Sequence, residues 1–248
     1  MYKQGLLCGD SISKIDFCQY CILGKQHRLA FKAVIHKSND VLEYVHSDLW
    51  GPARVSTHGG NRYFLSLIND YSRKVWLYLL KTKDEHIVLT KVKKWKALVE
   101  NQTSKKVKVL RTDNGLEFCN EEFEMFCKNQ GILRHKTVRN TPQQNGLAEM
   151  MNRTLLDRVK CMLYSSGLFK RFLGEVVMIA FYLVNKTPSS AIDFKTLKEL
   201  WSGKPSNYNH LRIFRCKAYV HQSEGKLEPR SIKCIFLGHP KGVKGYRL

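Results

Sequence analysis

Alternating apolar and polar residues run through five short stretches of the chain and predict β-strands there. Successive side chains of a strand point to opposite faces, so a period of two is its signature. The turn-forming segment 69–73 separates two of these stretches by the spacing of a hairpin. The five stretches are 42–50, 63–68, 74–80, 107–111 and 132–137.

Other stretches repeat their apolar residues every three or four positions, which is the period of an α-helix. Thr82 and Glu85 form the pattern of a capping box, and Asn120 is a second candidate helix start. Two segments carry the longest apolar stripes, Val88, Val92, Trp95 and Val99 in the first and Ala148, Met151, Leu155, Val159 and Met162 in the second.

The second stripe belongs to a helix predicted to begin after Pro142 and to end at Gly167. Another apolar helix is expected over 172–185, before Pro188. The order of strands and helices implies a mixed sheet with helices packed on it, an α/β fold.

A segment rich in turn formers, 202–207, reads as a linker after this fold. Beyond it, 211–220 and 232–237 predict strands of a small β unit. The sequence therefore predicts one main α/β body followed by a minor β structure.

The charge of the chain points to a polyanionic partner. Its 42 Lys and Arg residues oppose 21 Asp and Glu, a net charge of +21. Residues 1–150 carry 24 basic and 15 acidic groups, whereas 151–248 carry 18 and 6. Neutralising phosphates releases their condensed counterions, which favours nucleic acid as the partner. A basic surface kept for solubility is the alternative.

Nothing in the sequence indicates export or membrane insertion. There is no apolar run of eighteen residues, and the first residues lack the core of a signal peptide. We therefore expect a protein of the nucleus or cytoplasm that is not secreted and binds no membrane. In that setting its eight cysteines are expected to be reduced.

One cysteine pair, Cys18 and Cys21, has the spacing of a zinc knuckle. Two thiolates supply half of a tetrahedral site, so two further ligands are needed. His27 and His36 are the nearest candidates downstream, and Cys8 is the nearest upstream. Half of a zinc site and a pair of reduced cysteines without metal both remain open.

Three carboxylates stand where metal-dependent chemistry would place them. Asp48 lies at or near a strand end, Asp113 at the exit of the strand before a turn, and Glu149 off the apolar stripe of its helix. Three converging acids can hold two divalent cations about 4 Å apart for phosphoryl transfer, and hard cations prefer oxygen ligands. Asp70 is a further acid, which an Asx-type turn explains without chemistry.

The chain closely resembles the integrase region of copia-type long-terminal-repeat retrotransposon polyproteins, especially those of plants. The likeness covers essentially the whole chain and includes the 35 residues between Asp113 and Glu149. Its motifs are Phe17-Cys18-x-x-Cys21-x-x-Gly24-Lys25-Gln26, His46-Ser47-Asp48-Leu49-Trp50-Gly51-Pro52, Asp70-Tyr71-Ser72-Arg73, Leu110-Arg111-Thr112-Asp113-Asn114-Gly115-x-Glu117-Phe118, Thr141-Pro142-Gln143-Gln144-Asn145-Gly146-x-Ala148-Glu149-x-x-Asn152-Arg153, Gly203-Lys204-Pro205 and Phe236-Leu237-Gly238.

This resemblance implies three parts. Residues 35–204 would form a ribonuclease H-like integrase catalytic core, a mixed five-stranded sheet flanked by helices. Residues 1–34 would be a small remnant of a His-His-Cys-Cys zinc-binding module, and 208–248 a partial SH3-like β unit. On this likeness the chain is truncated at both ends, and Zn²⁺ would bind only if the missing ligands were supplied.

The resemblance also implies an activity. Asp48, Asp113 and Glu149 would be a D,D-35-E triad that binds Mg²⁺ or Mn²⁺. The expected function is a polynucleotidyl transferase and endonuclease that processes DNA ends and performs strand transfer in DNA integration. Its partners would be transposon ends and target DNA, and its functional form a homo-oligomer.

Residues near the triad take expected roles in DNA binding, from their chemistry and from the likeness. Asn114 would offer an amide to the scissile phosphate, and Gln144 and Asn145 would contact a DNA end. Arg153 and Lys160 would bind phosphates. An ordinary cap or a solvated side chain is the alternative in each case.

The sequence also departs from the family pattern. Met150 follows the glutamate where tryptophan is common, and Arg215 and Lys217 stand where glycine and proline are expected. A catalytically inactive nucleic-acid-binding relic of a transposable element is therefore the alternative function. A ribonuclease H-type nuclease acting on RNA–DNA hybrids is another.

Overall fold

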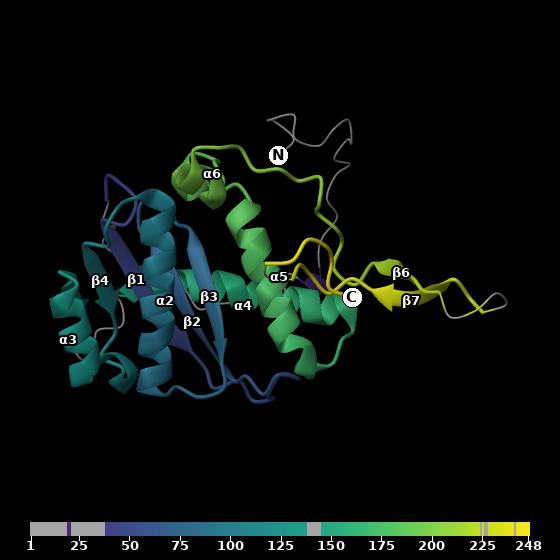
Figure 1. The fold of residues 1–248 in the computed structure, drawn as a ribbon, viewed down its shortest axis with the longest axis horizontal. Coiled ribbons are helices and arrows are strands. Elements are labelled where there is room, and N and C mark those ends of the chain that lie inside the picture. Colours follow the sequence, from purple (N-terminus) through teal and green to yellow (C-terminus); the bar gives the residue numbers. More distant parts are fainter. Residues whose placement is uncertain (1–18, 21–37, 138–144, 224, 226–227, 241) are drawn as a thin grey trace.

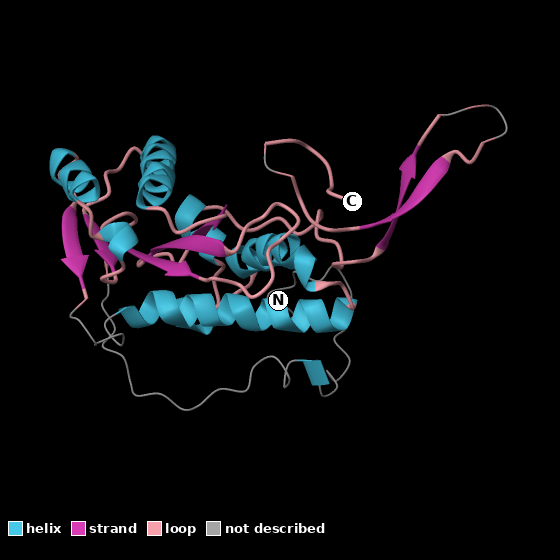
Figure 2. Cartoon of the chain, turned by 90° about the horizontal axis from the view of Figure 1, so that it is seen from below, coloured by secondary structure: helices cyan, strands magenta, loops and turns pink. Residues whose placement is uncertain are grey.

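Three layers, helix on sheet on helix, form the body of the structure (Figures 1 and 2). The computed structural model describes residues 19–20, 38–137, 145–223, 225, 228–240 and 242–248. The termini of several strands meet at one edge of the central sheet, and that edge positions the candidate site.

The central sheet has five strands in the order β3-β2-β1-β4-β5. The first three are antiparallel neighbours, whereas β4 and β5 run parallel to β1. Their bounds are β1 Tyr44–Trp50, β2 Tyr63–Asn69, β3 Val75–Leu80, β4 Val109–Thr112 and β5 Leu133–Lys136. The predicted mixed five-stranded sheet is confirmed.

Helices cover both faces of this sheet. Helix α2 packs on one face, where Trp95 and Val99 join Val45 of β1 and Leu110 of β4 in one apolar core. Helices α4 and α5 pack on the other face. The bounds are α2 Glu85–Thr103, α3 Glu121–Asn129, α4 Gly146–Ser166, α5 Leu173–Lys186 and α6 Leu197–Ser202.

The predicted apolar stripes are confirmed, but one predicted helix start is wrong. Asp84, not Thr82, caps α2, and its carboxylate accepts hydrogen bonds from the backbone N–H groups of His86 and Ile87. Asn120 caps α3 as expected. A true capping box at Thr196 begins α6, a helix that the sequence pattern did not predict. No helix in the described part of the chain has both the length and the apolarity to cross a bilayer.

The C-terminal part forms a two-stranded antiparallel hairpin, β6 Lys217–His221 and β7 Ser231–Ile235, which projects from the body (Figure 1). The first strand begins later than the predicted 211–220, because Arg215 has a φ of 65° and Cys216 N–H bonds back to Ile213. The chain then returns to α5, where Arg247 pairs with Glu175 at 3.0 Å.

Candidate functional site

Asp48 lies near the end of β1, on the sheet face covered by α4. Side chains alternate along a strand, and Val45 of β1 joins the core under α2. Tyr44, His46 and Asp48 therefore share the opposite face. The backbone carbonyl of Asp48 accepts a 3.2 Å hydrogen bond from Ser66 Oγ on β2, which fixes this part of the strand.

Asp113 is the first residue after β4, the parallel neighbour of β1. Because the two strands run in the same direction, the residues at their ends meet at one edge of the sheet. The backbone N–H of Gly115 donates a 3.1 Å hydrogen bond to Asp113 Oδ1 and fixes the turn. A Cβ at Gly115 would lie 2.6 Å from the Glu117 carboxylate, so a larger residue there would displace the Glu117 side chain.

Glu149 lies in the first turn of α4 and is half-buried. Ala148 and Met151 beside it are buried and anchor the helix on the sheet. The apolar stripe therefore fixes the helix, and Glu149 faces the sheet edge that bears Asp113 rather than the apolar core.

The three carboxylates interact electrostatically across three elements. Burial, followed by the negative charge of Asp113 and of Glu149, raises the pKa of Asp48 to about 6. Burial and the charge of Asp113 also raise the pKa of Glu149, and the cation of Arg153 opposes this shift. The fold thus brings together three acids whose ionised forms repel one another.

Asn145, the cap residue before α4, and Asn152 of α4 approach different oxygens of the Asp48 carboxylate. Asn152 Nδ2 donates to Asp48 Oδ2 at 2.6 Å, and Asn145 Nδ2 lies 3.4 Å from Oδ1. Asn145, Glu149 and Asn152 are spaced by four and three residues, so they share one side of the helix. The bond from Asn152 lowers the pKa of Asp48 and partly offsets its burial.

The structure corrects the expectation for Asn145. Its side chain is 1% exposed and is directed at Asp48 and the carbonyl of Ser47, so it is not positioned to contact DNA. Asn152 has a role that sequence reasoning missed. Its position three residues after Glu149 was a usable signal, since residues three apart lie on one helix side.

The other residues expected to contact DNA differ in their exposure and in their partners. Arg153 is exposed beside Glu149, whereas Lys160 pairs with Asp157 at 3.6 Å. The amide nitrogen of Asn114 donates to the carbonyl of Thr137, linking the turn after β4 to the end of β5. Gln144, Cys18 and Cys21 lie outside the described part of the chain, as do the further candidate zinc ligands Cys8, His27 and His36.

The donor set of the triad fits a hard divalent cation. It is made only of carboxylate oxygens, and a bound cation would relieve the repulsion that raises the pKa of Asp48. Within the described residues, however, no group of three or more His, Cys, Asp or Glu side chains is spaced to hold a metal ion. The chemistry of the three acids therefore matches a metal, and their present spacing is wider than that of a formed site.

Asp70 has a different role from the one expected. The neighbouring Asn69 makes the turn, because its side-chain Oδ1 accepts hydrogen bonds from the backbone N–H and the hydroxyl of Ser72. Asp70 is buried and accepts hydrogen bonds from Ser38, from His46 at 3.2 Å and from Arg73 at 3.1 Å. Burial alone would raise its pKa, but these bonds and the Arg73 charge hold it at about 2. Asp70 is thus a structural anchor.

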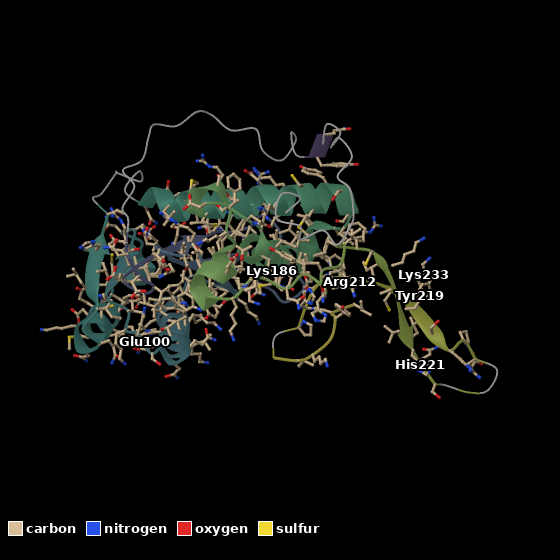
Figure 3. The ribbon with its side chains drawn as sticks, turned by 90° about the horizontal axis from the view of Figure 1, so that it is seen from above. Glu100, Lys186, Arg212, Tyr219, His221 and Lys233 are labelled. Atoms are coloured by element: carbon tan, nitrogen blue, oxygen red, sulfur yellow. The ribbon has the colours of Figure 1, made fainter. Side chains whose placement is uncertain are left out.

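The projecting hairpin has a basic and aromatic face. Tyr219 and Lys233 are paired across β6 and β7, and Tyr219 is 66% exposed. Because alternate residues share a face, Lys217 and His221 lie on the same side. Figure 3 shows Tyr219, His221 and Lys233 beyond the body of the molecule, with Arg212 nearer to it.

Comparison with known proteins gives two domain matches. Residues 38–142 match the Integrase core domain, and 216–248 match the Retroviral polymerase SH3-like domain. The first match contains Asp48 and Asp113, and Glu149 lies just beyond its end.

Plant retrotransposon polyproteins are similar over nearly the whole chain. The Retrovirus-related Pol polyprotein from transposon TNT 1-94 of Nicotiana tabacum is 44% identical over 249 residues, which is 99% of this chain and 19% of the polyprotein. The polyprotein from transposon RE2 of Arabidopsis thaliana is 29% identical over 94% of this chain and 16% of its own length. The chain thus spans about a fifth or less of these relatives.

A solved structure supports the fold. A chain of the simian T-cell lymphotropic virus intasome, determined in complex with the PP2A regulatory subunit B56 gamma, matches with a TM-score of 0.58. The match covers 85% of this chain and 73% of the other at 14% identity. The predicted ribonuclease H-like core agrees with this neighbour's fold.

Proposed function

We propose that this chain is the catalytic core of a retrotransposon integrase. Its matches to the Integrase core domain and the Retroviral polymerase SH3-like domain, and its similarity to retrotransposon polyproteins, support this proposal. In this proposal the chain cuts DNA ends and joins them to target DNA with a divalent cation. The observation that carries it is the meeting of Asp48, Asp113 and Glu149 from β1, the end of β4 and α4.

Asp48, Asp113 and Glu149 would hold Mg²⁺ or Mn²⁺. The cation would supply Lewis-acid stabilisation of charge at phosphorus and would favour the ionised nucleophile. In the cutting step, water adds to phosphorus and a P–O bond breaks, leaving a 3′-hydroxyl. In the joining step, that hydroxyl forms a new P–O bond and a target-strand oxygen leaves, so the number of phosphodiesters is unchanged.

The chain's own side chains orient this chemistry. Asn152 and Asn145 fix the rotation of the Asp48 carboxylate, because each approaches a different oxygen. Arg153 is exposed next to Glu149 and would pair with a backbone phosphate. These contacts position a polyanion at the three acids without reading its sequence.

The spacing of the acids supports a site completed on binding. A bound cation would remove the repulsion among the three carboxylates and so would favour a closer arrangement of them. Catalytic hydrogen bonds are often loose without substrate and tighten in the complex. A second copy of the chain and DNA are the proposed partners for the assembled enzyme.

The hairpin supplies a further DNA-binding surface in this proposal. Lys217, Lys233 and His221 surround the exposed ring of Tyr219, a combination that suits phosphates and unpaired bases. The hairpin lies on the opposite side of the molecule from β4, whose end bears Asp113 (Figure 1), so it would hold a separate part of the DNA.

A strand-transfer assay with Mg²⁺, comparing the wild type with Glu149→Gln, tests the proposed function. It also tests the alternative of an inactive relic, because a relic would retain DNA binding but give no product with either protein.

A further inference from the structure

Arg111 lies on the same sheet face as the candidate triad. It precedes Asp113 by two residues, and alternate residues of a strand point the same way. Its neighbour Leu110 joins the core under α2, which confirms that Arg111 faces the opposite side. Two residues of a strand span about 6.6 Å, a separation similar to that of successive phosphates along a nucleic-acid strand.

The guanidinium of Arg111 has unused hydrogen-bonding capacity. Its Nη1 donates to the Tyr44 hydroxyl at 3.1 Å, and its Nε is buried without a partner, so a ligand would contact the terminal nitrogens. Among the described residues no carboxylate forms an ion pair with it. A half-buried guanidinium has five N–H donors and favours bidentate contact with a phosphate or carboxylate.

Neighbouring side chains hold Arg111 in place. The Tyr44 hydroxyl that accepts from Arg111 also lies 2.9 Å from Nδ1 of the exposed His135. Tyr44 itself is 3% exposed, so the hydroxyl is a rigid support. These contacts reduce the entropy that a free arginine would lose on binding an anion.

Space for a ligand lies next to these residues. A hollow of about 300 Å³ is lined by Tyr44, His135, Lys108 and Glu43, among others. Lys108 pairs with Glu43 at 2.9 Å, so its charge is partly neutralised. Tyr44 and Val109, which line the hollow, are the first residues of β1 and β4, and Arg111 lies along β4 between that end and Asp113.

We infer that Arg111 binds the backbone phosphate next to the scissile one, with Tyr44 and His135 positioning its guanidinium. This inference rests on the proposed integrase function and names a subsite of the DNA substrate. Arg111 is a binding residue that sets where the strand lies along β4, and it takes no part in bond breaking.

The test uses DNA duplexes that carry one neutral methylphosphonate at successive positions around the scissile phosphate. In the wild type, neutralising one of the two flanking phosphates should slow cleavage on the order of tenfold. Arg111→Gln should slow cleavage of unmodified DNA by a similar factor. A methylphosphonate at that same flanking position should then slow its cleavage no further. Tyr44→Phe, which keeps the buried ring, should show a partial loss at the same position.

Lys94→Gln is the matched control, because Lys94 is exposed on α2, the helix that covers the other face of the sheet. It removes one positive charge and should retain the wild-type pattern. Thermal unfolding of each variant separates a folding defect from a lost contact, and Arg111→Lys should restore part of the phosphate sensitivity if the fold is intact.

Binding measured by fluorescence anisotropy gives a readout independent of cleavage. If the wild type gives no product, the proposed function fails, while the methylphosphonate scan of affinity still tests Arg111. A wild-type pattern of phosphate sensitivity in folded Arg111→Gln would overturn the inference, whether the readout is cleavage or binding.

Discussion

The side-chain amide of Asn152 donates a 2.6 Å hydrogen bond to Oδ2 of Asp48 and thereby joins α4 to the end of β1. The two residues are 104 positions apart in the sequence. This contact holds the first carboxylate of the triad and stabilises its ionised form.

Replacing Asn152 with Ala should impair the site through Asp48. Loss of the bond should raise the pKa of Asp48 further above about 6 and move the acidic limb of the pH–rate profile upward. A hydrogen bond to a charged group contributes roughly 1.5–3 kcal/mol, which is about one to two pKa units, so activity near neutral pH should fall roughly twofold to tenfold. Thr154→Ala, at an exposed position of the same helix, is the control. An unchanged pH midpoint would show that Asn152 does not act on Asp48.

Removing the Asp48 charge should stabilise the metal-free protein at pH 7.5. The folded pKa of about 6 exceeds the unfolded value of about 3.9, so the folded state binds more protons between them. Stability therefore falls as pH rises from about 4 to about 6 and stays lower above that range. Asp48→Asn should raise the Tm at pH 7.5 in chelator and show little difference at pH 4.

The same experiment reports on metal binding. Mg²⁺ should raise the Tm of the wild type at pH 7.5, because binding to the folded state stabilises it, and should leave Asp48→Asn unaffected. Glu121→Gln, an acid in the first turn of α3, is the control and should respond to Mg²⁺ as the wild type does. A lower Tm for Asp48→Asn in chelator would contradict the repulsion among the three acids.

Replacing Arg153 with Gln should weaken binding to DNA of any sequence alike. A phosphate contact contributes about one unit to the slope of log affinity against log salt, and this slope should decrease accordingly. Lys94→Gln removes the same charge from the opposite face and should change the slope less. A loss confined to one DNA sequence would assign Arg153 to base recognition instead.

Asp70→Asn should act on stability rather than on metal binding. The carboxylate accepts bonds from Ser38, His46 and Arg73 in a buried site, and breaking such a set costs about 3 kcal/mol. Because its folded pKa of about 2 lies below the unfolded value, this contribution is present above about pH 4 and is lost as pH falls towards 2. Urea unfolding of the wild type and of Asp70→Asn at pH 7 measures this difference in the free energy of unfolding. Unchanged unfolding with lost Mg²⁺ response would instead place Asp70 in the active site.

Much of the fold was predictable because local periodicity decides it. The stripe of Val88, Val92, Trp95 and Val99 is buried as the three-to-four spacing predicted. The sequence pattern did not predict that β1 and β4 pair in parallel. The positions of Asp48 and Asp113 at the ends of predicted strands nevertheless indicated where the site would lie. The predicted cap of α2 was wrong because Thr82 and Asp84 are both residue types that suit an N-cap. In the structure the side chain of Asp84 accepts the backbone hydrogen bonds.

The supporting residues of the site depend on tertiary contacts and were not predictable. Asn145 sits at a helix start, where an exposed anion-binding role was the natural expectation, but packing of α4 on β1 buries it. Asn152 lies on α4, whereas its partner Asp48 lies on β1, so their hydrogen bond depends on the packing of the two elements. Helix α6 is only six residues long, too short to show a period.

The most direct test of the account is strand transfer by the full chain on a short blunt DNA duplex with Mg²⁺. The wild type should give joined products that disappear with chelator. Glu149→Gln should remain folded, bind the duplex and give none, and Thr154→Ala should match the wild type. Equal product from the wild type and Glu149→Gln would contradict the claim that Asp48, Asp113 and Glu149 form the catalytic triad.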